Sequence, residues 1–415
     1  MFLELNIRRL AGGTALGVAA CSALPSVQTE AREPSLTLIP EVSPVAARSA
    51  DGPAEEHSVL YPRLTGAGDQ LVLSWTEVLE DHRSGLRASR LIDGVWSTPM
   101  RVAEGDDWFV NWADFPSVVA SSSGLFAHWL VRDEGGRYAY HVEYSTSRSG
   151  DVWSAPGWLH DDRSAVEHGF VTTLALGDGF FSAWLDGRVD DSMKLISRAS
   201  ALPHGVPLGR EVELDAKTCS CCPTAAVQLD DGSVLVAYRD RSASEVRDIA
   251  LVRGMPGEPA SWSEPRIPHA DGWLIPGCPV NGPALAVGPE RVALAWFTMG
   301  DDEKPRVQVT FSDDGTNFGW AIPVDDGLPG GRVSIAALPG RDAFVVGWLE
   351  LVGDTAQWRL RLLEPGTEHA SVVLADVTGG RPDGMLSLAA GVRDVFAAWT
   401  DARSGSIGLM RISCE

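Results

Sequence analysis

The chain repeats one short pattern along most of its length, and this repetition constrains the fold more than any other feature. The pattern is an apolar run that ends in an aromatic residue, and it recurs at intervals of about 54 residues. A period of this length indicates a supersecondary unit that stacks on copies of itself to bury its apolar faces. The seven aromatic residues are Trp75, Trp129, Trp184, Tyr238, Trp296, Trp348 and Trp399.

Each unit contains the signals of four antiparallel strands. A second apolar strand precedes the aromatic run, and turn residues such as Asp231-Gly232 separate the two. An alternating strand follows, for example 306–311, and then a short fourth strand, for example 321–324. Four antiparallel strands at this period are typical of a β-propeller blade. The first two strands are apolar on both faces, as expected of strands buried between neighbouring blades.

The two ends of the repeat region complement each other. The last unit stops at Cys414 after three strands, whereas residues 36–39 form an apolar segment before the first unit. A ring of sheets must close or leave an unpaired edge. We therefore predict an all-β fold, a single β-propeller of four-stranded antiparallel blades over 36–415, closed by this N-terminal strand. The repeat count gives seven blades, with six as the alternative.

The N-terminus carries a different signal. Arg8 and Arg9 precede an apolar stretch over 10–20, which is too short to span a bilayer and ends in Val18-Ala19-Ala20-Cys21. This ending resembles the lipobox of bacterial lipoproteins, and an ordinary secretory signal is the alternative. The resemblance implies a signal peptide over 1–20, then lipidated Cys21 and a flexible tether over 21–35. Ser22 after the cysteine implies an outer-membrane lipoprotein of the bacterial cell envelope.

The net charge of the chain limits the classes of partner that it can bind. The formal net charge of −22 would repel nucleic acid and anionic headgroups, so we expect neither to bind the propeller. Membrane contact is expected only through the N-terminal lipid. We expect a monomer whose partner is a small polar or glycan ligand, a metal ion or another envelope protein.

Two turns after a third strand are similar to a known family motif. Residues 312–318 read Ser-Asp-Asp-Gly-Thr-Asn-Phe, and 147–153 are a weaker copy. These segments resemble the Asp-box of sialidase-like (BNR-repeat) propellers, a turn between strands three and four. The resemblance implies the fold more than the activity. Sialidases use a tyrosine nucleophile late in the chain, but Tyr238 in the fourth unit is the last tyrosine here. Tyr61-Pro62-Arg63 is similar to the motif of the family's first substrate-binding arginine.

A cysteine cluster precedes the innermost strands of the fourth and fifth units. The starts of these strands surround the mouth of the central channel, where propellers usually bind ligands. One interpretation is a pair of disulfides that staple a loop, which suits an oxidising envelope. Another is a thiolate and imidazole site for copper or zinc, and a third is a pair that cycles between thiol and disulfide. The candidate metal ligands are Cys219, Cys221, Cys222, Cys278, His168 and His269.

A second pattern, Asp followed closely by Arg, comes after three of the repeat aromatics. In the structural interpretation, the carboxylate caps a tight loop and pairs with the arginine. In the functional interpretation, these charges ring the mouth and bind a polar ligand. The residues are Asp186, Arg188, Asp240, Arg241, Asp401 and Arg403.

Three functions follow as hypotheses from these features. The preferred one is a non-catalytic envelope lipoprotein with a binding site at the propeller mouth, including the copper or zinc site. The first alternative is a glycoside hydrolase of the sialidase superfamily, or a carbohydrate-binding protein. The second alternative is a scaffold that binds another envelope protein.

Overall fold

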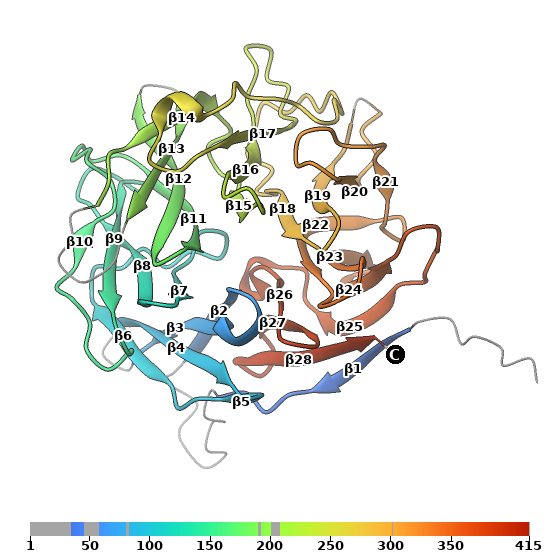
Figure 1. The fold of residues 1–415 in the computed structure, drawn as a ribbon, viewed down its shortest axis with the longest axis horizontal. Helices are drawn as coiled ribbons and strands as arrows, with labels where there is room; N and C mark the ends of the chain where they lie inside the picture. The colour runs from blue at the N-terminus through green and yellow to red at the C-terminus, as the bar shows by residue number, and fades with distance from the viewer. Residues whose placement is uncertain are drawn as a thin grey trace, which may run out of the picture. The chain divides into compact units, whose positions relative to one another are not determined.

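The computed structural model describes residues 35–44, 58–79, 83–189, 192–200, 208–300 and 302–414. Their strands form seven antiparallel sheets arranged around a common axis (Figure 1). The count of seven blades, rather than six, is therefore confirmed. The predicted signal peptide, Cys21 and the tether up to residue 34 lie outside the described residues. Within the described part of the chain, no helix is long and apolar enough to cross a membrane.

The blades follow one another in chain order. Blade one contains β2 (Ser58–Thr65), β3 (Val72–Val78), β4 (Ser84–Ile92) and β6 (Met100–Gly105), with short β5 (Val95–Trp96) on β4; blade two contains β7 (Ser117–Ser121), β8 (Gly124–Arg132), β9 (Tyr140–Ser147) and β10 (Gly157–Trp158). Blade three contains β11 (His168–Leu176), β12 (Gly179–Val189), β13 (Ser192–Ser200) and β14 (Val212–Thr218); blade four contains β15 (Ala225–Gln228), β16 (Val234–Arg239) and β17 (Ile249–Gly254).

The remaining blades are regular four-stranded sheets. Blade five contains β18 (Ala284–Val287), β19 (Val292–Thr298), β20 (Arg306–Ser312) and β21 (Ile322–Pro323); blade six contains β22 (Pro329–Ala337), β23 (Phe344–Val352), β24 (Thr355–Leu363) and β25 (Val372–Val377). Blade seven contains β26 (Ser387–Ala390), β27 (Val395–Asp401), β28 (Ser406–Cys414) and β1 (Leu36–Pro40). Three short 3-10 helices, η1 (Gly68–Gln70), η2 (Pro259–Ser261) and η3 (Arg381–Asp383), lie in connections.

The N-terminal strand closes the ring as predicted. β1 pairs antiparallel with β28, and Leu38 lies opposite Ile412. Leu36 and Leu38 also pack against the apolar cluster that joins blades six and seven. The last blade is thus built from both ends of the propeller.

Blade four departs from the prediction of four strands. Only three strands form a ladder there, and the fourth is reduced to a single bridge between Leu251 and Arg266. Pro265 and Pro268 flank this bridge. A proline has no backbone N–H to donate to a ladder, which explains why pairing stops at one residue.

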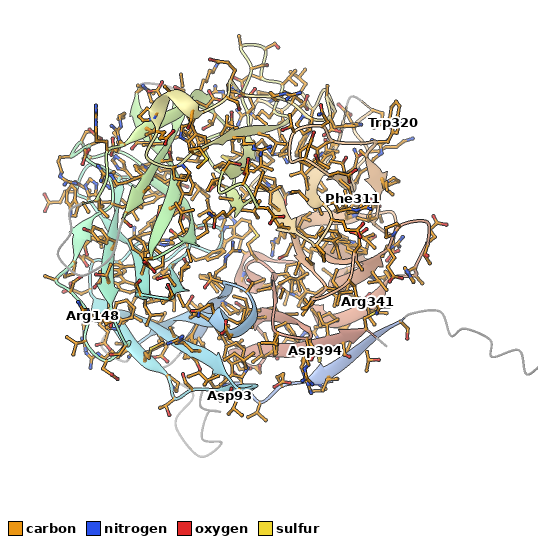
Figure 2. All side chains as sticks on the ribbon, viewed as in Figure 1. Asp93, Arg148, Phe311, Trp320, Arg341 and Asp394 are labelled. Atoms are coloured by element: carbon orange, nitrogen blue, oxygen red, sulfur yellow. A yellow bond between two sulfur atoms is a disulfide. The ribbon has the colours of Figure 1, made fainter. Side chains whose placement is uncertain are left out.

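The repeat aromatics are buried between the sheets. The side chains of Trp75, Trp184, Tyr238, Trp296 and Trp348 are all less than 2% exposed. Side chains fill the space between neighbouring sheets, whereas Trp320, which is 92% exposed, lies at the periphery (Figure 2). The apolar runs seen in the sequence are therefore the core of the propeller.

The Asp-box segment forms the expected turn between the third and fourth strands of blade five. Asp314 Oδ1 accepts hydrogen bonds of 2.7 Å from the backbone N–H groups of both Thr316 and Asn317. The aspartate is needed because a tight turn leaves these donors without backbone acceptors. The motif therefore has a structural role in this chain.

Hydrogen bonds that involve side chains join each blade to the next around the channel. Every junction has at least one. They are Thr65 Oγ1 to Val118 O, Phe170 N to Asp114 Oδ1 (2.8 Å), Thr224 Oγ1 to Phe170 O (2.8 Å), Arg239 Nε to Asn281 O (2.9 Å), Arg332 N to Asn281 Oδ1 (2.7 Å), Leu388 N to Ser334 Oγ (3.0 Å) and Leu64 N to Ser387 Oγ (2.9 Å).

Candidate functional site at the channel mouth

The inner strands enclose a central cavity of about 130 Å³. Residues from several blades line it, among them Arg63, Phe115, Pro223 and Arg332. A second cavity of about 40 Å³ shares Arg63 and Phe115 and adds Asp114 to its wall. Charged groups of opposite sign therefore face the same small space at the mouth.

A larger hollow lies elsewhere and lacks comparable chemistry. It has a volume of about 530 Å³ and lies between β17 and the Asp-box loop of blade five. Two arginines line it: Arg253 already pairs with Asp231 at 2.6 Å and donates to Ser233 and Thr316, and Arg266 is exposed to solvent. Hydrogen bonds from Ser233 lower the pKa of Asp231 in the same wall to about 2, so it is no acid–base group at neutral pH, and volume alone does not identify the site.

The chain is strained where four of the inner strands begin. Tyr61, Phe170, Val280 and Arg332 all have φ between 52° and 53°. This left-handed conformation is costly for residues with bulky side chains and concentrates at functional sites. In β2, β11 and β22 it coincides with a shift of strand register. Such irregularities re-aim side chains, here at the edge of the channel.

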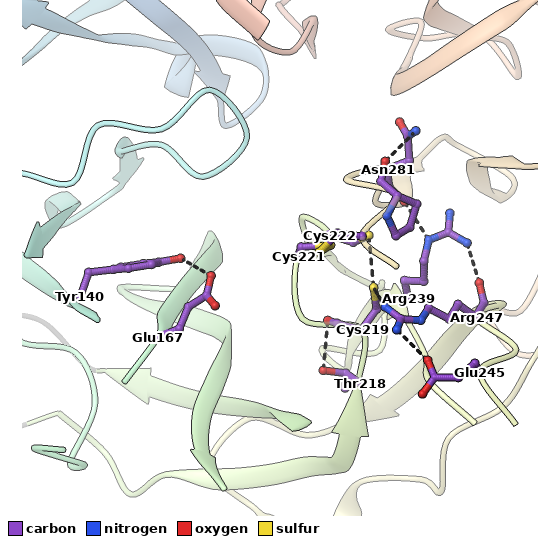
Figure 3. Close-up of a disulfide and its surroundings, with 12 residues drawn as sticks. Tyr140, Glu167, Thr218, Cys219, Cys221, Cys222, Arg239, Glu245, Arg247 and Asn281 are labelled. Carbon is purple, nitrogen blue, oxygen red and sulfur yellow. Dashed lines mark hydrogen bonds and ion pairs between the residues drawn. A yellow bond between two sulfur atoms is a disulfide. The ribbon is translucent and has the colours of Figure 1, made fainter. Parts of the chain in front are cut away.

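A buried tyrosine links two carboxyl groups between blades two and three. Tyr140 Oη lies 2.7 Å from Asp114 Oδ2 and 3.0 Å from Glu167 Oε1. Figure 3 shows Tyr140 and Glu167 pointing toward each other. The hydroxyl has one proton and can donate to one carboxylate only. The other contact is therefore a hydrogen bond only when its carboxyl group carries a proton of its own.

We call Asp114, Tyr140 and Glu167 the proton cluster. The pKa values of its two carboxyl groups agree with that geometry. Burial raises the pKa of Asp114 to about 7, against the hydrogen bonds from Tyr140 and the Phe170 N–H that lower it. Burial likewise raises the pKa of Glu167 to about 7. A carboxyl group with a pKa near 7 can both give and take a proton at neutral pH. Asp114 is 2% exposed, whereas Glu167 is only partly buried and forms the open side of the cluster.

A glycine makes room for the proton cluster. A Cβ atom on Gly169 would lie 2.0 Å from Asp114 Oδ2 and 2.6 Å from Tyr140 Oη. Both distances are far below van der Waals contact. The close approach of the backbone at Gly169 is thus a condition for the shared proton site.

Arg63 is a partly buried cation beside the proton cluster. Its guanidinium lies 5.6 Å from the centre of the Phe115 ring. Among the residues that the structure describes, no carboxylate pairs with it, and burial lowers its pKa. An arginine in such a place attracts an anion. Arg332 differs, because backbone carbonyls of Gly380 and Gly384 already accept its N–H groups.

The structure brings the four predicted sulfurs together. Cys221 and Cys278 form a disulfide with a Cα–Cα distance of 5.9 Å, and Cys219 Sγ lies 3.6 Å from Cys222 Sγ (Figure 3). The ligand atoms of Cys219, Cys221 and Cys222 all lie within 4.8 Å of one another. Because Cys221 and Cys278 are bonded, the predicted site of four thiolates is not formed in this state.

The two free thiols differ strongly. The Cys222 thiol and the Arg247 guanidinium, whose Nη1 donates to Cys219 Sγ at 3.2 Å, lower the pKa of Cys219 to about 6. Burial raises the pKa of Cys222 well above its ordinary value. Cys219 is therefore the thiolate of the pair at neutral pH and Cys222 the thiol.

The structure does not place either predicted histidine ligand with these sulfurs. His168 Nε2 lies 3.1 Å from Asp162 Oδ2, and its ring stacks on His160 at 3.8 Å. His269 Nδ1 lies 2.9 Å from Asp271 Oδ1. The cluster of potential ligand atoms around the sulfurs contains no histidine among the described residues. The repeat positions of these histidines predicted that they would lie near the cysteines. In the structure, each histidine instead contacts a carboxylate that is close to it in the chain.

Three histidines gather without forming a convincing metal site. His141, His160 and His168 have ligand atoms within 4.8 Å of one another. The rings of His160 and His168, however, are stacked with an interplanar angle of 5°. Imidazole lone pairs lie in the ring plane, so two stacked parallel rings cannot both direct them at one ion.

Asp186 and Arg188 have the contacts of the structural interpretation. Asp186 Oδ2 accepts from the indole of Trp184 at 3.0 Å, and both its oxygens bond Arg188. Similar carboxylate contacts satisfy the polar atoms of other repeat aromatics. They are Glu77 with Trp75, Glu143 with Trp129, Asp215 with Tyr238, Asp271 with Trp296 and Glu350 with Trp348.

The other two Asp–Arg pairs do not form ion pairs in the described structure. Arg241 pairs with Glu245 at 2.7 Å instead of Asp240. Asp401 Oδ1 accepts the backbone N–H of Arg403 at 3.1 Å and so caps its own loop. These contacts favour local structural roles over a ring of charges for a ligand.

The comparisons with known proteins concern the fold. No family profile and no curated protein matches the sequence. A polysaccharide lyase described as PL25-ulvan lyase is similar in structure, with a TM-score of 0.53 at 10% identity over 86% of this chain and 94% of the lyase. Polysaccharide lyase Uly1 has a TM-score of 0.50 at 11% identity, over 88% and 91%. A Hadza microbial sialidase has a TM-score of 0.48 at 12% identity, over 80% and 73%, which is too distant to support an argument.

These likenesses show the propeller architecture, as the repeat and Asp-box predicted. The proton cluster was missed from the sequence. One available signal was position: Asp114 precedes the inner strand of blade two, as Cys222 does in blade four. The contact of Tyr140 with Glu167, from different blades, leaves no such local pattern.

We expect Asp186→Ala to destabilise the propeller by about 3 kcal/mol, because it leaves the Trp184 indole without its acceptor and Arg188 with Glu211 alone. Asp401→Ala is the matched control from the same repeat position and should cost about 1 kcal/mol, because its loop is open to water. Urea denaturation followed by tryptophan fluorescence measures both. Equal losses in the two variants would contradict the fastener role of Asp186.

We also expect Asp114 to make stability pH-dependent. Its folded pKa of about 7 exceeds the unfolded value, so the native state holds an extra proton between about pH 4 and 7. This contribution to stability is lost as pH rises through 7. Asp114→Asn keeps an acceptor for the Phe170 N–H. Its free energy of unfolding, relative to that of the wild type, should increase by on the order of 2 kcal/mol when the pH is raised from 4.5 to 8. Urea midpoints at both pH values test this, and a constant difference would contradict it.

Proposed function

We propose that the channel mouth binds an acidic polysaccharide and cleaves it by acid–base catalysis. The observation that carries the proposal is the proton cluster of Asp114, Tyr140 and Glu167 beside the unneutralised Arg63. Glycosidic bonds are broken with the help of groups that give and take protons, and carboxyl groups with raised pKa values serve this purpose.

Each part of the mouth has a distinct task in this proposal. The cavity shared by Arg63 and Asp114 holds about 40 Å³, which suits a carboxylate but not a sugar ring. The sugar therefore stays at the mouth and inserts its acidic group toward Arg63. Glu167, the more open carboxyl, exchanges the proton with the substrate, and Tyr140 passes it to Asp114.

The fold neighbours support the class of substrate. The PL25-ulvan lyase has been described bound to -[GlcA(1-4)Rha3S]-, a carboxylated and sulfated disaccharide unit. It shares the propeller architecture at a TM-score of 0.53. An envelope lipoprotein, as the N-terminus suggests, would meet such polysaccharides outside the inner membrane.

The test is incubation with a panel of uronic-acid-containing and sialylated polysaccharides. We expect new chain ends, measured as reducing sugar and as unsaturated product, the latter marking elimination. Glu167→Gln and Tyr140→Phe should lower kcat by about 100-fold or more. Arg63→Gln should mainly raise KM for carboxylated chains. Asp401→Asn, which lies in a structural loop, should leave the rate unchanged. No cleavage of any acidic chain by correctly folded protein would refute the proposal.

A second candidate function is a thiolate metal site. We propose that the chain binds one copper or zinc ion when Cys221 and Cys278 are reduced. The 3.6 Å between Cys219 and Cys222 Sγ supports this, since two sulfurs on one tetrahedral zinc at about 2.3 Å each lie slightly under 4 Å apart. Soft thiolates suit both metals.

Metal analysis tests this second function. Protein reduced under anaerobic conditions and dialysed against zinc or Cu(I) should retain about one ion per chain. Cys219→Ser should abolish retention, and Cys414→Ser, which removes a cysteine remote from the cluster in sequence and topology, should not. Metal-free wild-type protein under these conditions would exclude the site.

A further inference from the structure

The four clustered sulfurs divide into a buried dithiol and a disulfide with one exposed end. Cys219 and Cys222 are each 1% exposed and Cys221 is 8% exposed, whereas Cys278 is an exposed residue. We propose that they form a two-electron relay, in which the disulfide bond moves between the Cys221–Cys278 and Cys219–Cys222 positions. This proposal does not rest on polysaccharide cleavage.

The first step is attack of the Cys219 thiolate on Cys221 Sγ. These sulfurs lie within 4.8 Å of each other. A new Cys219–Cys221 bond forms, the Cys221–Cys278 bond breaks, and Cys278 leaves as a thiolate that takes a proton from solvent. Because Cys278 is exposed, its thiolate is released where water can stabilise it.

The second step moves the disulfide bond to the buried pair, Cys219 and Cys222. Cys222 Sγ, 3.6 Å from Cys219 Sγ, loses its proton and attacks Cys219. The Cys219–Cys222 bond forms, and Cys221 leaves and is protonated. In total, one disulfide and two thiols become another disulfide and two thiols. No external oxidant or reductant is consumed.

Arg247 determines which sulfur begins the exchange. Its Nη1 donates to Cys219 Sγ at 3.2 Å, and Glu245 holds the same guanidinium through Nη2 at 2.7 Å. A cation fixed beside a sulfur favours the thiolate, which is the attacking species. Cys222 is equally buried but lacks this contact among the described residues, so it serves as the resolving thiol.

The position of the bond changes how blades four and five are joined. Cys221–Cys278 connects the segment before β15 to the segment before β18, with a sequence separation of 57. A Cys219–Cys222 bond stays within one loop. The relay therefore opens a covalent staple at the junction beside the three-stranded blade, while the Arg239–Asn281 hydrogen bond remains.

The decisive experiment is disulfide mapping of Cys278→Ser in an oxidising glutathione buffer with a metal chelator present. After acid quenching, alkylation and peptide mass spectrometry, we expect a Cys219–Cys222 bond in most of the protein. The matched control, Cys414→Ser, should keep Cys221–Cys278. A folded Cys278→Ser protein in which Cys219 stays a free thiol would overturn the relay.

The wild type provides a test without loss of any sulfur. Protein holding one disulfide should give both bond positions when quenched after equilibration, and Arg247→Gln should slow their interconversion at pH 7 at least several-fold. A single bond position at every time and pH would also overturn the proposal. If that protein still cleaved polysaccharide, the relay would be refuted while the proposed cleavage function stood.

Discussion

Closure of the ring is the constraint on which the rest of the structure depends. Each blade has apolar residues on both faces of its inner strands, so none can be buried until its neighbours are in place. The side-chain hydrogen bonds between inner strands and the pairing of β1 with β28 fix the seven blades around one axis. Once the ring is closed, the starts of all inner strands must surround one channel.

Several features that destabilise the folded state lie together at the mouth, and the closed ring compensates for them. Left-handed residues such as Phe170 and Arg332, buried carboxyls and an unneutralised Arg63 each oppose folding locally. They persist because large apolar clusters on both sides of each blade outweigh them. Polar groups that serve only stability look different here: both carboxylate oxygens of Asp186 and of Glu350 accept hydrogen bonds.

The sequence was sufficient for the fold because its signals are local and repeated. Trp75 and its six counterparts mark the blades, and the missing last strand required residues 36–39. The three-stranded blade four was missed, although Pro265 and Pro268 were visible, because a short fourth strand is weakly encoded. The contacts of the site could not be predicted in the same way. They depend on which side chains from different blades meet, which repeat spacing does not specify.

One chain of contacts connects the two reactive clusters. The segment that carries Cys219 and Cys222 continues into Thr224, whose hydroxyl donates to Phe170 O at 2.8 Å. The N–H of the same Phe170 donates to Asp114 Oδ1 at 2.8 Å. Phe170 is held at a φ of 53°, so a displacement of either neighbour acts on a residue that is already strained. Movement of the disulfide into the 219–222 loop thus bears directly on the carboxyl group that shares the proton of Tyr140.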